Sequence, residues 1–503
     1  MDKRCLGVEL GSTRIKAVAI DEERRPAAFG SYTWASSFEN GLWTYSLDEV
    51  WEGLRAALSE LDGRELISAA GISGMMHGYL AFDSDWRLLT PFRTWQNTVT
   101  GRAAAELSEL FRFNIPQRWS IAHLYQAFLN GEEHLSRIAH ITTLAGYVHY
   151  MLTGVNAVGV GEASGMMPVD ENGDFDKEMI ALFDGLTRGG LPPLRSLLPK
   201  VLSAGENAGY LTESGSKLLE GLLRPGIPFA PPEGDAGTGM AATNCVAPRT
   251  GNVSAGTSIF SMIVLDRPMS GYYPEIDIVA TPTGRPVAMV HCGNCSGDIN
   301  AWADIFREAA ELFGGDSERL YELLFRKSLE GDADCGGIVV YNYLAGESIT
   351  GLDEGRPMVL RSPDSSFTLA NFMRAQLYSS MATLRIGMDI LTREGVEIDS
   401  LTAHGGLFKT PGVAQRFLAA ACRVPVKCLD TAGEGGPFGM ALMAEYMLRS
   451  DRSQSLEDCL ARHFEGTGAS VMLPDSGDAA GFDAFLTRYK KAMAAERAAV
   501  ENL

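Results

Sequence analysis

One acidic residue of this chain stands beside small-residue turns, in surroundings that suit chemistry on a phosphate group. Asp235 follows Gly234 and precedes Ala236 and Gly237. A strand-like segment then runs into a second turn, residues 254–258, with the sequence Ser-Ala-Gly-Thr-Ser. Glycine lets backbone N–H groups approach a phosphate closely, and hydroxyl groups add further donors. These residue types favour a base beside the phosphates of a nucleotide.

The same turn chemistry occurs near the N-terminus, where an apolar strand breaks at Gly11-Ser12-Thr13 and then resumes. Aligning this turn with Gly256-Thr257-Ser258 gives each half of the chain an opening hairpin. The pattern indicates an internal duplication. Lys16, just beyond the first turn, fits a solvated strand position as well as a phosphate ligand.

Two further segments place polar and aromatic side chains where a small molecule could bind. The apolar strand predicted over 67–73 ends in the loop Gly74-Met75-Met76-His77-Gly78. A strand that stops in this way delivers side chains to the carboxyl edge of a sheet, where α/β proteins bind ligands. Trp95 and Asn97 follow in the run 91–97; an indole ring stacks on the apolar face of a sugar, and an amide matches its hydroxyls. Taken alone, His77 also fits a structural histidine, and Trp95 a core side chain.

Length and charge limit the classes of function. A chain of 503 residues is too long for one ordinary core and predicts two domains, with a boundary near 245–250. The net charge of -20 argues against an extended nucleic-acid surface, because phosphate neutralisation needs clustered Lys and Arg. ATP is still compatible, since Mg²⁺, loop amides and helix N-termini can hold it. A neutral second substrate suits this acidic field.

The lack of an apolar targeting segment and the pattern of cysteines both predict a cytoplasmic protein. No apolar run reaches the length of a signal peptide or of a membrane span, so we expect a cytoplasmic protein without a membrane partner. The eight scattered cysteines indicate reduced thiols. One local cluster, His291-Cys292 with Cys295, has half of the ligand spacing of a metal or iron–sulfur site. No second pair stands at such spacing, which favours two buried, inert thiols.

Periodicity predicts an α/β chain in which strands and helices alternate. Ser46 begins a capping pattern before an apolar helix. A glycine-rich loop, 159–167, carries Glu162. The main predicted strands are 5–20 as a hairpin, 67–73, 252–265, 276–280, 286–292, 401–403 and 424–429. The main predicted helices are 99–111, 121–130, 141–152, 299 onward with Ser296 or Asp298 as its cap, 367–393 and 411–421, followed by surface helices in the tail.

In this order the motifs resemble the FGGY family of carbohydrate kinases, most closely its xylulokinase-like and ribulokinase-like members. The resemblance spans the chain to about residue 448 and rests on five motifs in the order and spacing of the family. They are the first phosphate hairpin 7–13, the sugar loop 71–78, the aspartate motif Gly234-Asp235-Ala236, the second phosphate hairpin at Gly256-Thr257-Ser258, and the adenosine loop Gly405-Gly406.

The resemblance implies a fold and a reaction. The fold is α/β, with two actin-like (ribonuclease H-like) ATPase domains and an interdomain cleft. The implied domains are 1–247, which binds sugar and phosphate and holds the catalytic aspartate, 248–450, which binds ATP, and 451–503, a helical tail packed on the second domain. The implied reaction transfers the γ-phosphate of Mg-ATP to a hydroxyl of a ketopentose of the xylulose or ribulose class.

The resemblance also assigns roles to individual residues. Asp235 orients the sugar hydroxyl and accepts its proton, and positioning matters more than base strength in so dissociative a transfer. Glu9 organises the Mg²⁺ shell. The expected sugar ligands are Met76, His77, Trp95 and Asn97, together with Asp235. The expected ATP ligands are Gly11, Ser12, Thr13, Gly256, Thr257, Gly405 and Gly406.

Two departures from the family pattern leave alternatives open. The family usually has Asp where this chain has Glu9, which places the carboxylate one methylene further out. Xylulokinases commonly have Gln where this chain has Met75, so D-xylulose, L-ribulose and L-xylulose all stay open as substrates. A second class of function is a non-kinase ATPase switch of the same fold, with an iron–sulfur site at Cys292 and Cys295. The oligomeric state is open, with a homodimer as one option.

Overall fold

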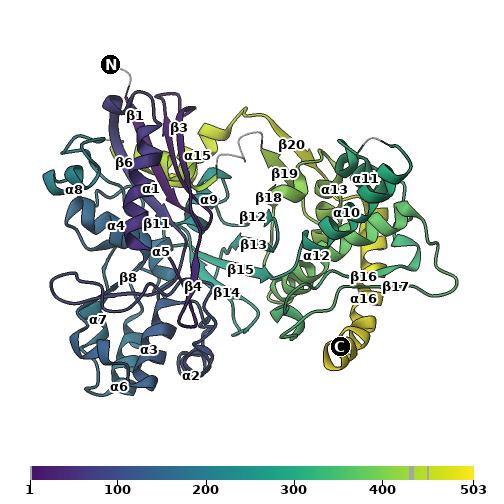
Figure 1. The fold of residues 1–503 in the computed structure, drawn as a ribbon, viewed down its shortest axis with the longest axis horizontal. Coiled ribbons are helices and arrows are strands. Elements are labelled where there is room, and N and C mark those ends of the chain that lie inside the picture. Colours follow the sequence, from purple (N-terminus) through teal and green to yellow (C-terminus); the bar gives the residue numbers. More distant parts are fainter. Residues whose placement is uncertain (1–2, 316, 430–434, 450–452) are drawn as a thin grey trace. The chain divides into compact units, whose positions relative to one another are not determined.

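The computed structural model describes residues 3–315, 317–429, 435–449 and 453–503, which form two compact units (Figure 1). The first unit comprises Met1–Ala247, Tyr272–Val287 and Glu434–Glu465, and the second comprises Pro248–Gly271, Ala288–Gly433 and Gly466–Leu503. This interleaved division differs from the contiguous blocks 1–247, 248–450 and 451–503. The chain returns to the first unit because the helix α14 (Gly435–Leu448) packs on strands near the N-terminus.

A five-stranded sheet in the order β11-β6-β1-β2-β3 forms the centre of the first unit. Its strands are β1 (Arg4–Leu10), β2 (Arg14–Ile20), β3 (Pro26–Thr33), β6 (Ile67–Gly74) and β11 (Glu233–Gly234). β1, β2 and β3 pair antiparallel, which confirms the hairpin predicted over 5–20, whereas β6 and β11 run parallel to β1. The carboxyl ends of β1, β6 and β11 therefore share one edge.

Helices cover both faces of this sheet, and α1 (Leu47–Ser59) packs on β2 and β3 (Figure 1). Ser46 caps α1 by accepting from the backbone N–H of Glu49, as the capping pattern predicted. A Cβ at Gly30 would lie 1.9 Å from a carbonyl of α1, and a Cβ at Gly7 would lie 1.9 Å from a carbonyl of α14. Neighbouring strand positions alternate between faces, so the two helices pack on opposite sides.

The rest of the first unit is helical with short strand pairs. Its other elements are β4 (Ser37–Glu39), β5 (Leu42–Thr44), β7 (Leu80–Phe82), β8 (His140–Thr142), β9 (Ala157–Gly159), β10 (Lys200–Leu202), β14 (Asp277–Ala280), α2 (Gly101–Phe111), α3 (Ser120–Asn130), α4 (Leu144–Thr153), α5 (Val160–Ser164), α6 (Lys177–Thr187), α7 (Leu194–Leu197), α8 (Glu213–Leu218), α9 (Asp235–Ala242) and α15 (Leu456–Phe464). Two predictions of secondary structure are wrong in this unit. Residues 140–142 pair with β7 instead of opening a helix. Residues 157–164 form β9 and α5 instead of a glycine-rich loop.

The second unit repeats the sheet order of the first. Its strands follow the order β15-β13-β12-β18-β19-β20, with β12 (Thr250–Ala255), β13 (Ile259–Val264), β15 (Pro286–Cys292), β18 (Ser400–His404), β19 (Val426–Leu429) and β20 (Ala469–Met472). β12 and β13 form an antiparallel hairpin, and β18 and β19 run parallel to β12. The same arrangement joins β1, β2, β6 and β11, which supports the internal duplication predicted from the two turns.

Long helices complete the second unit: α10 (Gly297–Leu312), α11 (Leu320–Ser328), α12 (Leu369–Arg393), α13 (Val413–Cys422) and α16 (Ser476–Asn502), with the strand pair β16 (Val339–Tyr341) and β17 (Met358–Leu360). α12 matches the helix predicted over 367–393. α16 packs on this unit through one face, on which Phe482 and Phe485 are buried with their rings 4.8 and 5.5 Å from that of Tyr378. Within the described residues, none of the helices combines the length and the apolar composition that a membrane span requires.

Candidate active site

Asp235 opens α9 at the carboxyl edge of the first sheet, directly after β11. Its Oδ1 accepts a hydrogen bond from the backbone N–H of Met76 at 3.2 Å, which ties it to the loop after β6. The side chain reaches solvent, yet the surrounding protein removes enough water to raise the pKa of Asp235 to about 7, and the charge of Glu9 adds to the rise. Such a carboxylate can accept a proton near neutral pH.

Glu9 lies near the end of β1, between Lys16 on β2 and Ser73 on β6. Its carboxylate is largely buried, which raises its pKa, and the ammonium of Lys16, 3.6 Å from Oε2, opposes the rise. The sequence did not decide whether Lys16 faces solvent or binds phosphate. In the structure its ammonium pairs with Glu9. A Cβ at Gly436 would lie 2.4 Å from Glu9 Oε1, so a glycine of α14 makes room for this carboxylate.

A pair of buried hydroxyls joins β6 to α9 behind Asp235, and sequence reasoning missed it. The Oγ of Ser73 lies 2.8 Å from Oγ1 of Thr238, one helical turn after Asp235. Thr238 also donates to the carbonyl of Gly234 at 3.3 Å. The spacing of three residues from Asp235 along α9 was the available signal. The hydroxyl pair fixes the start of α9 against the end of β6.

The turn after β1 is held from behind through its carbonyls. The N–H of Gly11 donates to Arg14 O at 3.0 Å and closes the turn. Trp34 Nε1 donates to Gly11 O at 2.7 Å, and Tyr45 Oη donates to Ser12 O at 2.7 Å. Ser12 and Thr13 are exposed. With its carbonyls engaged by the protein, the turn presents hydroxyls to solvent at the edge that carries Asp235.

The loop after β6 places His77 and Met76 against the segment that follows α5. His77 has a left-handed backbone, with φ of 74°, which is strained for a residue with a side chain. Its Nδ1 lies 3.0 Å from the carbonyl of Gly165, so Nδ1 carries the hydrogen and donates. Its ring also stacks on Trp119. Both Met76 and His77 are buried. The packing around the loop therefore holds His77 in this strained conformation.

Trp95 and Asn97 lie in one loop but differ in their surroundings. The side chain of Trp95 is 39% exposed and available to a ligand. Asn97 is buried, and its amide is engaged: Nδ2 donates to Trp43 O at 2.8 Å, and Oδ1 accepts from Trp43 N at 2.9 Å. Asn97 thereby clamps the strand β5 to this loop. Its predicted contact with a sugar stays a prediction.

The second unit brings its two predicted nucleotide motifs together. Ser254 and His404 are register partners on the parallel strands β12 and β18, so the turn at Gly256-Thr257 and the loop at Gly405-Gly406 lie side by side. Gly405 has φ of 105°, and a Cβ there would lie 2.3 Å from the carbonyl of Ala255. Only glycine fits such a position. A Cβ at Gly256 or Gly406 would meet nothing within 4 Å, which leaves their backbone open.

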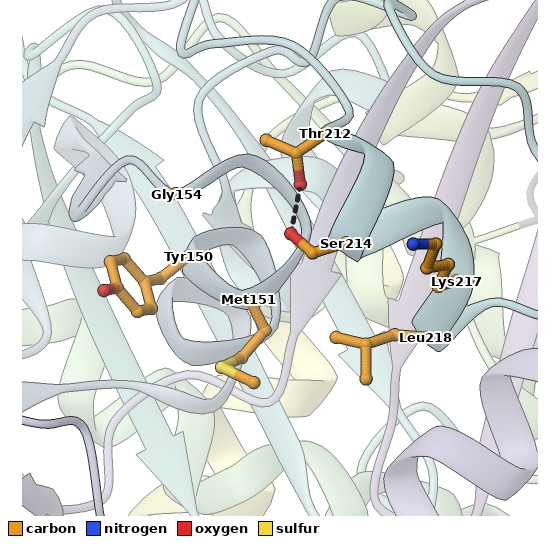
Figure 2. A pocket seen from close by; sticks show the side chains of 7 residues that line it. All are labelled: Tyr150, Met151, Gly154, Thr212, Ser214, Lys217 and Leu218. Atoms are coloured by element: carbon orange, nitrogen blue, oxygen red, sulfur yellow. Dashed lines mark hydrogen bonds between the residues drawn. The ribbon is translucent and has the colours of Figure 1, made fainter.

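One surface pocket of the first unit, about 520 Å³ in volume, lies apart from these residues in the fold (Figure 2). Its walls come from α4 and α8 and include Tyr150, Met151 and Lys217, and a hydrogen bond joins Thr212 to Ser214. None of the predicted site residues lines it. We attach no function to this pocket.

Family comparison decides what these motifs belong to. The N-terminal domain of the FGGY family of carbohydrate kinases matches residues 4–241, and the C-terminal domain of that family matches residues 251–448. Together the two matches cover most of the chain. The chain belongs to the FGGY family of carbohydrate kinases. This confirms the resemblance inferred from five short motifs.

Individual relatives of this FGGY kinase cover nearly the whole chain at low identity. The xylulose kinase of Haemophilus influenzae is 21% identical over 87% of this chain and 90% of its own length. The crystal structure of xylulose kinase from Rhodospirillum rubrum has a TM-score of 0.81 at 19% identity and covers 99% of this chain and 100% of that chain. Gluconate kinase from Lactobacillus acidophilus gives a TM-score of 0.81 at 16% identity, with 98% of each chain covered. The predicted α/β fold class is confirmed.

The alternative of an iron–sulfur ATPase switch finds no support in this FGGY kinase. Cys292 and Cys295 are free, buried thiols, and burial raises the pKa of both, that of Cys295 to about 12. In the part of the chain that the structure describes, no three His, Cys, Asp or Glu side chains are grouped to hold a metal ion. A buried, protonated thiol pair is a packing feature.

Proposed function

We propose that this FGGY kinase transfers the γ-phosphate of ATP to a hydroxyl of a ketopentose of the xylulose or ribulose class. The observation that carries the proposal is Asp235, a carboxylate with a pKa near 7 that the sugar loop holds through the N–H of Met76. The ketopentose class is supported by relatives that bear the name xylulose kinase and match along nearly the whole chain.

In this proposal Asp235 is the base. It accepts a hydrogen bond from the attacking hydroxyl, orients its oxygen toward the γ-phosphorus and takes its proton as the new O–P bond forms. Its contact with Met76 fixes one oxygen, which leaves the other for the substrate. Because the transferring phosphoryl group carries little bond order to either oxygen, orientation contributes more than basicity.

Glu9 and its surroundings fit a magnesium site of the kind that kinases use. Mg²⁺ prefers oxygen ligands, keeps several waters and binds through one or two carboxylates plus substrate phosphates. Glu9 offers one carboxylate, and its charge acts on the nearby Asp235. When bound, Mg²⁺ would neutralise charge on the phosphate oxygens. Glu9 would hold waters of that shell, and Lys16 would balance its charge.

The remaining predicted ligands divide by what they offer. Ser12 and Thr13 after β1, and Gly256 and Thr257 after β12, would donate to phosphate oxygens. Gly405 and Gly406 would leave room for the adenosine. Met76, His77 and Trp95 would line the sugar site, with the Trp95 ring stacked on an apolar sugar face. Asn97 would act on the sugar through the Trp95 loop that it clamps to Trp43.

The decisive test is ADP release with Mg-ATP across D-xylulose, L-ribulose, L-xylulose, D-ribulose, D-gluconate and glycerol. We expect one ketopentose to stimulate ADP release well above the rate without sugar. Preference for gluconate or glycerol would overturn the ketopentose class while keeping the kinase. The predicted cytoplasmic location and homodimer stay predictions.

A further inference from the structure

Two buried glutamates, Glu162 and Glu233, lie beside Asp235 and have no part in the reaction proposed above. Both side chains are 0% exposed. Glu233 begins β11, two residues before Asp235. Glu162 belongs to α5, which packs on β11 and on α9. Fully buried carboxyl groups are rare unless a partner or a proton compensates their charge, so this pair requires an explanation.

Each of the two side chains reaches the backbone of the segment that carries the other. Glu233 Oε1 accepts from the N–H of Gly161 at 3.1 Å, and its Oε2 accepts from the N–H of Glu162 at 2.8 Å. In return, the carboxyl group of Glu162 reaches the backbone of Gly234, where a Cβ would lie 2.6 Å from Oε2. Helix α5 is therefore joined to the turn that presents Asp235.

Three glycines make room for this pair. A Cβ at Gly159 would lie 2.2 Å from Oε1 of Glu233, and a Cβ at Gly161 would lie 2.5 Å from its Oε2. Gly234 leaves the corresponding space for Glu162. The glycines of the run 159–162 and Gly234 of the Asp235 motif thus have a role in packing. They admit two carboxyl groups into the packing behind the base.

The two glutamates differ in their hydrogen bonds. Glu233 has two N–H donors, one for each oxygen. Among the residues that the structure describes, neither oxygen of Glu162 accepts a hydrogen bond of good geometry. Burial raises the pKa of Glu162 well above its usual range, the charges of Glu233 and Asp235 add to this, and the Thr143 hydroxyl opposes it. An ionised carboxylate here would be buried without a positively charged partner, which favours the neutral acid at Glu162.

The other charged groups on the elements around α5 have partners or solvent of their own. Asp277 on β14 forms an ion pair with Arg118. Lys200 on β10 is exposed. His77 donates to the carbonyl of Gly165, just after α5. Burial also raises the pKa of Glu233 to about 8, although its two N–H donors oppose the rise.

We propose that Glu162 is a positioning residue for Asp235: as a neutral acid it packs against Gly234 and holds the base in place without adding a second negative charge. The proposal rests on the assignment of Asp235 as the base. A carboxylate at position 162 would repel both Asp235 and the incoming phosphate. A missing side chain would leave a cavity behind Gly234 and let the turn move, and small displacements of a base are costly to the rate.

The kinetic test compares Glu162→Ala with Glu162→Gln, with the exposed Glu171→Gln as the matched control. We expect Glu162→Ala to lower kcat about tenfold or more while the KM for Mg-ATP stays unchanged. Glu162→Gln, a neutral side chain of the same shape, should restore most of the lost kcat. If Glu162→Ala keeps its kcat, or if Glu162→Gln loses as much as Glu162→Ala, the neutral positioning role is overturned.

A second measurement needs no substrate and compares urea unfolding of wild type and Glu162→Gln from about pH 5 to about pH 8. A group whose pKa is raised in the folded state binds more protons there, so its contribution to stability falls as pH rises above the unfolded value. Glu162→Gln should therefore gain stability over wild type as pH rises. Glu233→Gln should lose stability throughout, because an amide nitrogen cannot accept from an N–H.

A pH-independent difference between wild type and Glu162→Gln would show that Glu162 is ionised in the fold and would overturn the proposal. The unfolding result also separates two kinds of failure. If no sugar is phosphorylated, the proposed function fails, yet the unfolding curves still report whether Glu162 carries a proton.

Discussion

The turn after β1 and the turn after β12 are each closed by the N–H of a glycine but have different chemical neighbours. The N–H of Gly11 donates to Arg14 O at 3.0 Å, and the N–H of Gly256 donates to Ser258 O at 2.9 Å. Both turns are held from behind through their carbonyls. Trp34 binds Gly11 O in the first, and Ser296 binds Gly256 O in the second. The duplicated sheet thus provides two similar glycine turns, for which we propose phosphate binding.

The difference lies two residues before each glycine. The first hairpin has Glu9 there and the second has Ser254. Opposite them on the neighbouring parallel strand stand Ser73 and His404, respectively. Glu9 lies close enough to Asp235 to raise its pKa. The sheet and its opening hairpin therefore occur in both copies, whereas the proposed base and the proposed metal residue belong to the first copy alone.

The largest expected effect comes from removing the base of the first copy. Asp235→Asn should lower kcat about 10²–10⁴-fold, because the amide cannot accept the proton, while the KM values for sugar and ATP change little. Steady-state kinetics on the sugar chosen by the panel checks this. Asp170→Asn in a surface turn is the control. Near-normal turnover by Asp235→Asn would remove Asp235 from the mechanism.

A smaller effect should separate the two hairpins directly. Glu9→Gln should raise the Mg²⁺ concentration needed for half-maximal activity by about tenfold to a hundredfold, as expected when a group that organises a metal shell is lost. Ser254→Ala, at the equivalent place in the second hairpin, should leave the Mg²⁺ requirement unchanged. Magnesium titrations of both variants decide the matter. Equal effects would mean that the metal does not distinguish the two turns.

The pH dependence should report the carboxylate of the first copy. Because the pKa of Asp235 is raised to about 7, the active carboxylate is lost as pH falls below that value. kcat/KM should therefore drop about tenfold per pH unit on the acid side and level off above neutrality. A profile flat down to about pH 5 would contradict the raised pKa.

The smallest effect concerns the backbone of the second copy. Gly405→Ala should lower the free energy of unfolding by about 1–3 kcal/mol, because alanine at a φ of 105° is strained and its Cβ would meet Ala255 O. Gly406→Ala, whose Cβ meets nothing within 4 Å, is the matched control and should unfold like wild type. Urea unfolding measures both. Equal stability of the two variants would contradict the close approach of β12 to the Gly405 loop.

Much of the fold, and the choice of Asp235 for the candidate site, could be predicted from the sequence because the signals are local. The hairpin around Gly11, the Ser46 cap and the helix over 367–393 depend on periodicity and turn chemistry within a few residues. Five motifs in fixed order were enough to identify the family. Asp235 stands out for the same reason, as an acid between glycines at the start of a helix.

Other features could not be read locally. The 159–167 segment has the composition of a loop, yet β9 pairs with β10 and α5 is held by the side chain of Glu233, more than seventy residues away. Asn97 has an amide of the kind that binds sugar hydroxyls, but in the structure this amide is hydrogen-bonded to the backbone of Trp43. Contacts of this range depend on which strands become neighbours.

By itself the sequence determined the family, the two turns and the acid between glycines, because these reside in residue type and short spacing. Tertiary structure decided what surrounds the acid: the pairing of Glu9 with Lys16, the Ser73–Thr238 hydroxyls and the Glu162–Glu233 pair. The physical reason is that pKa and position depend on burial and on partners that only the packed sheet edge brings together.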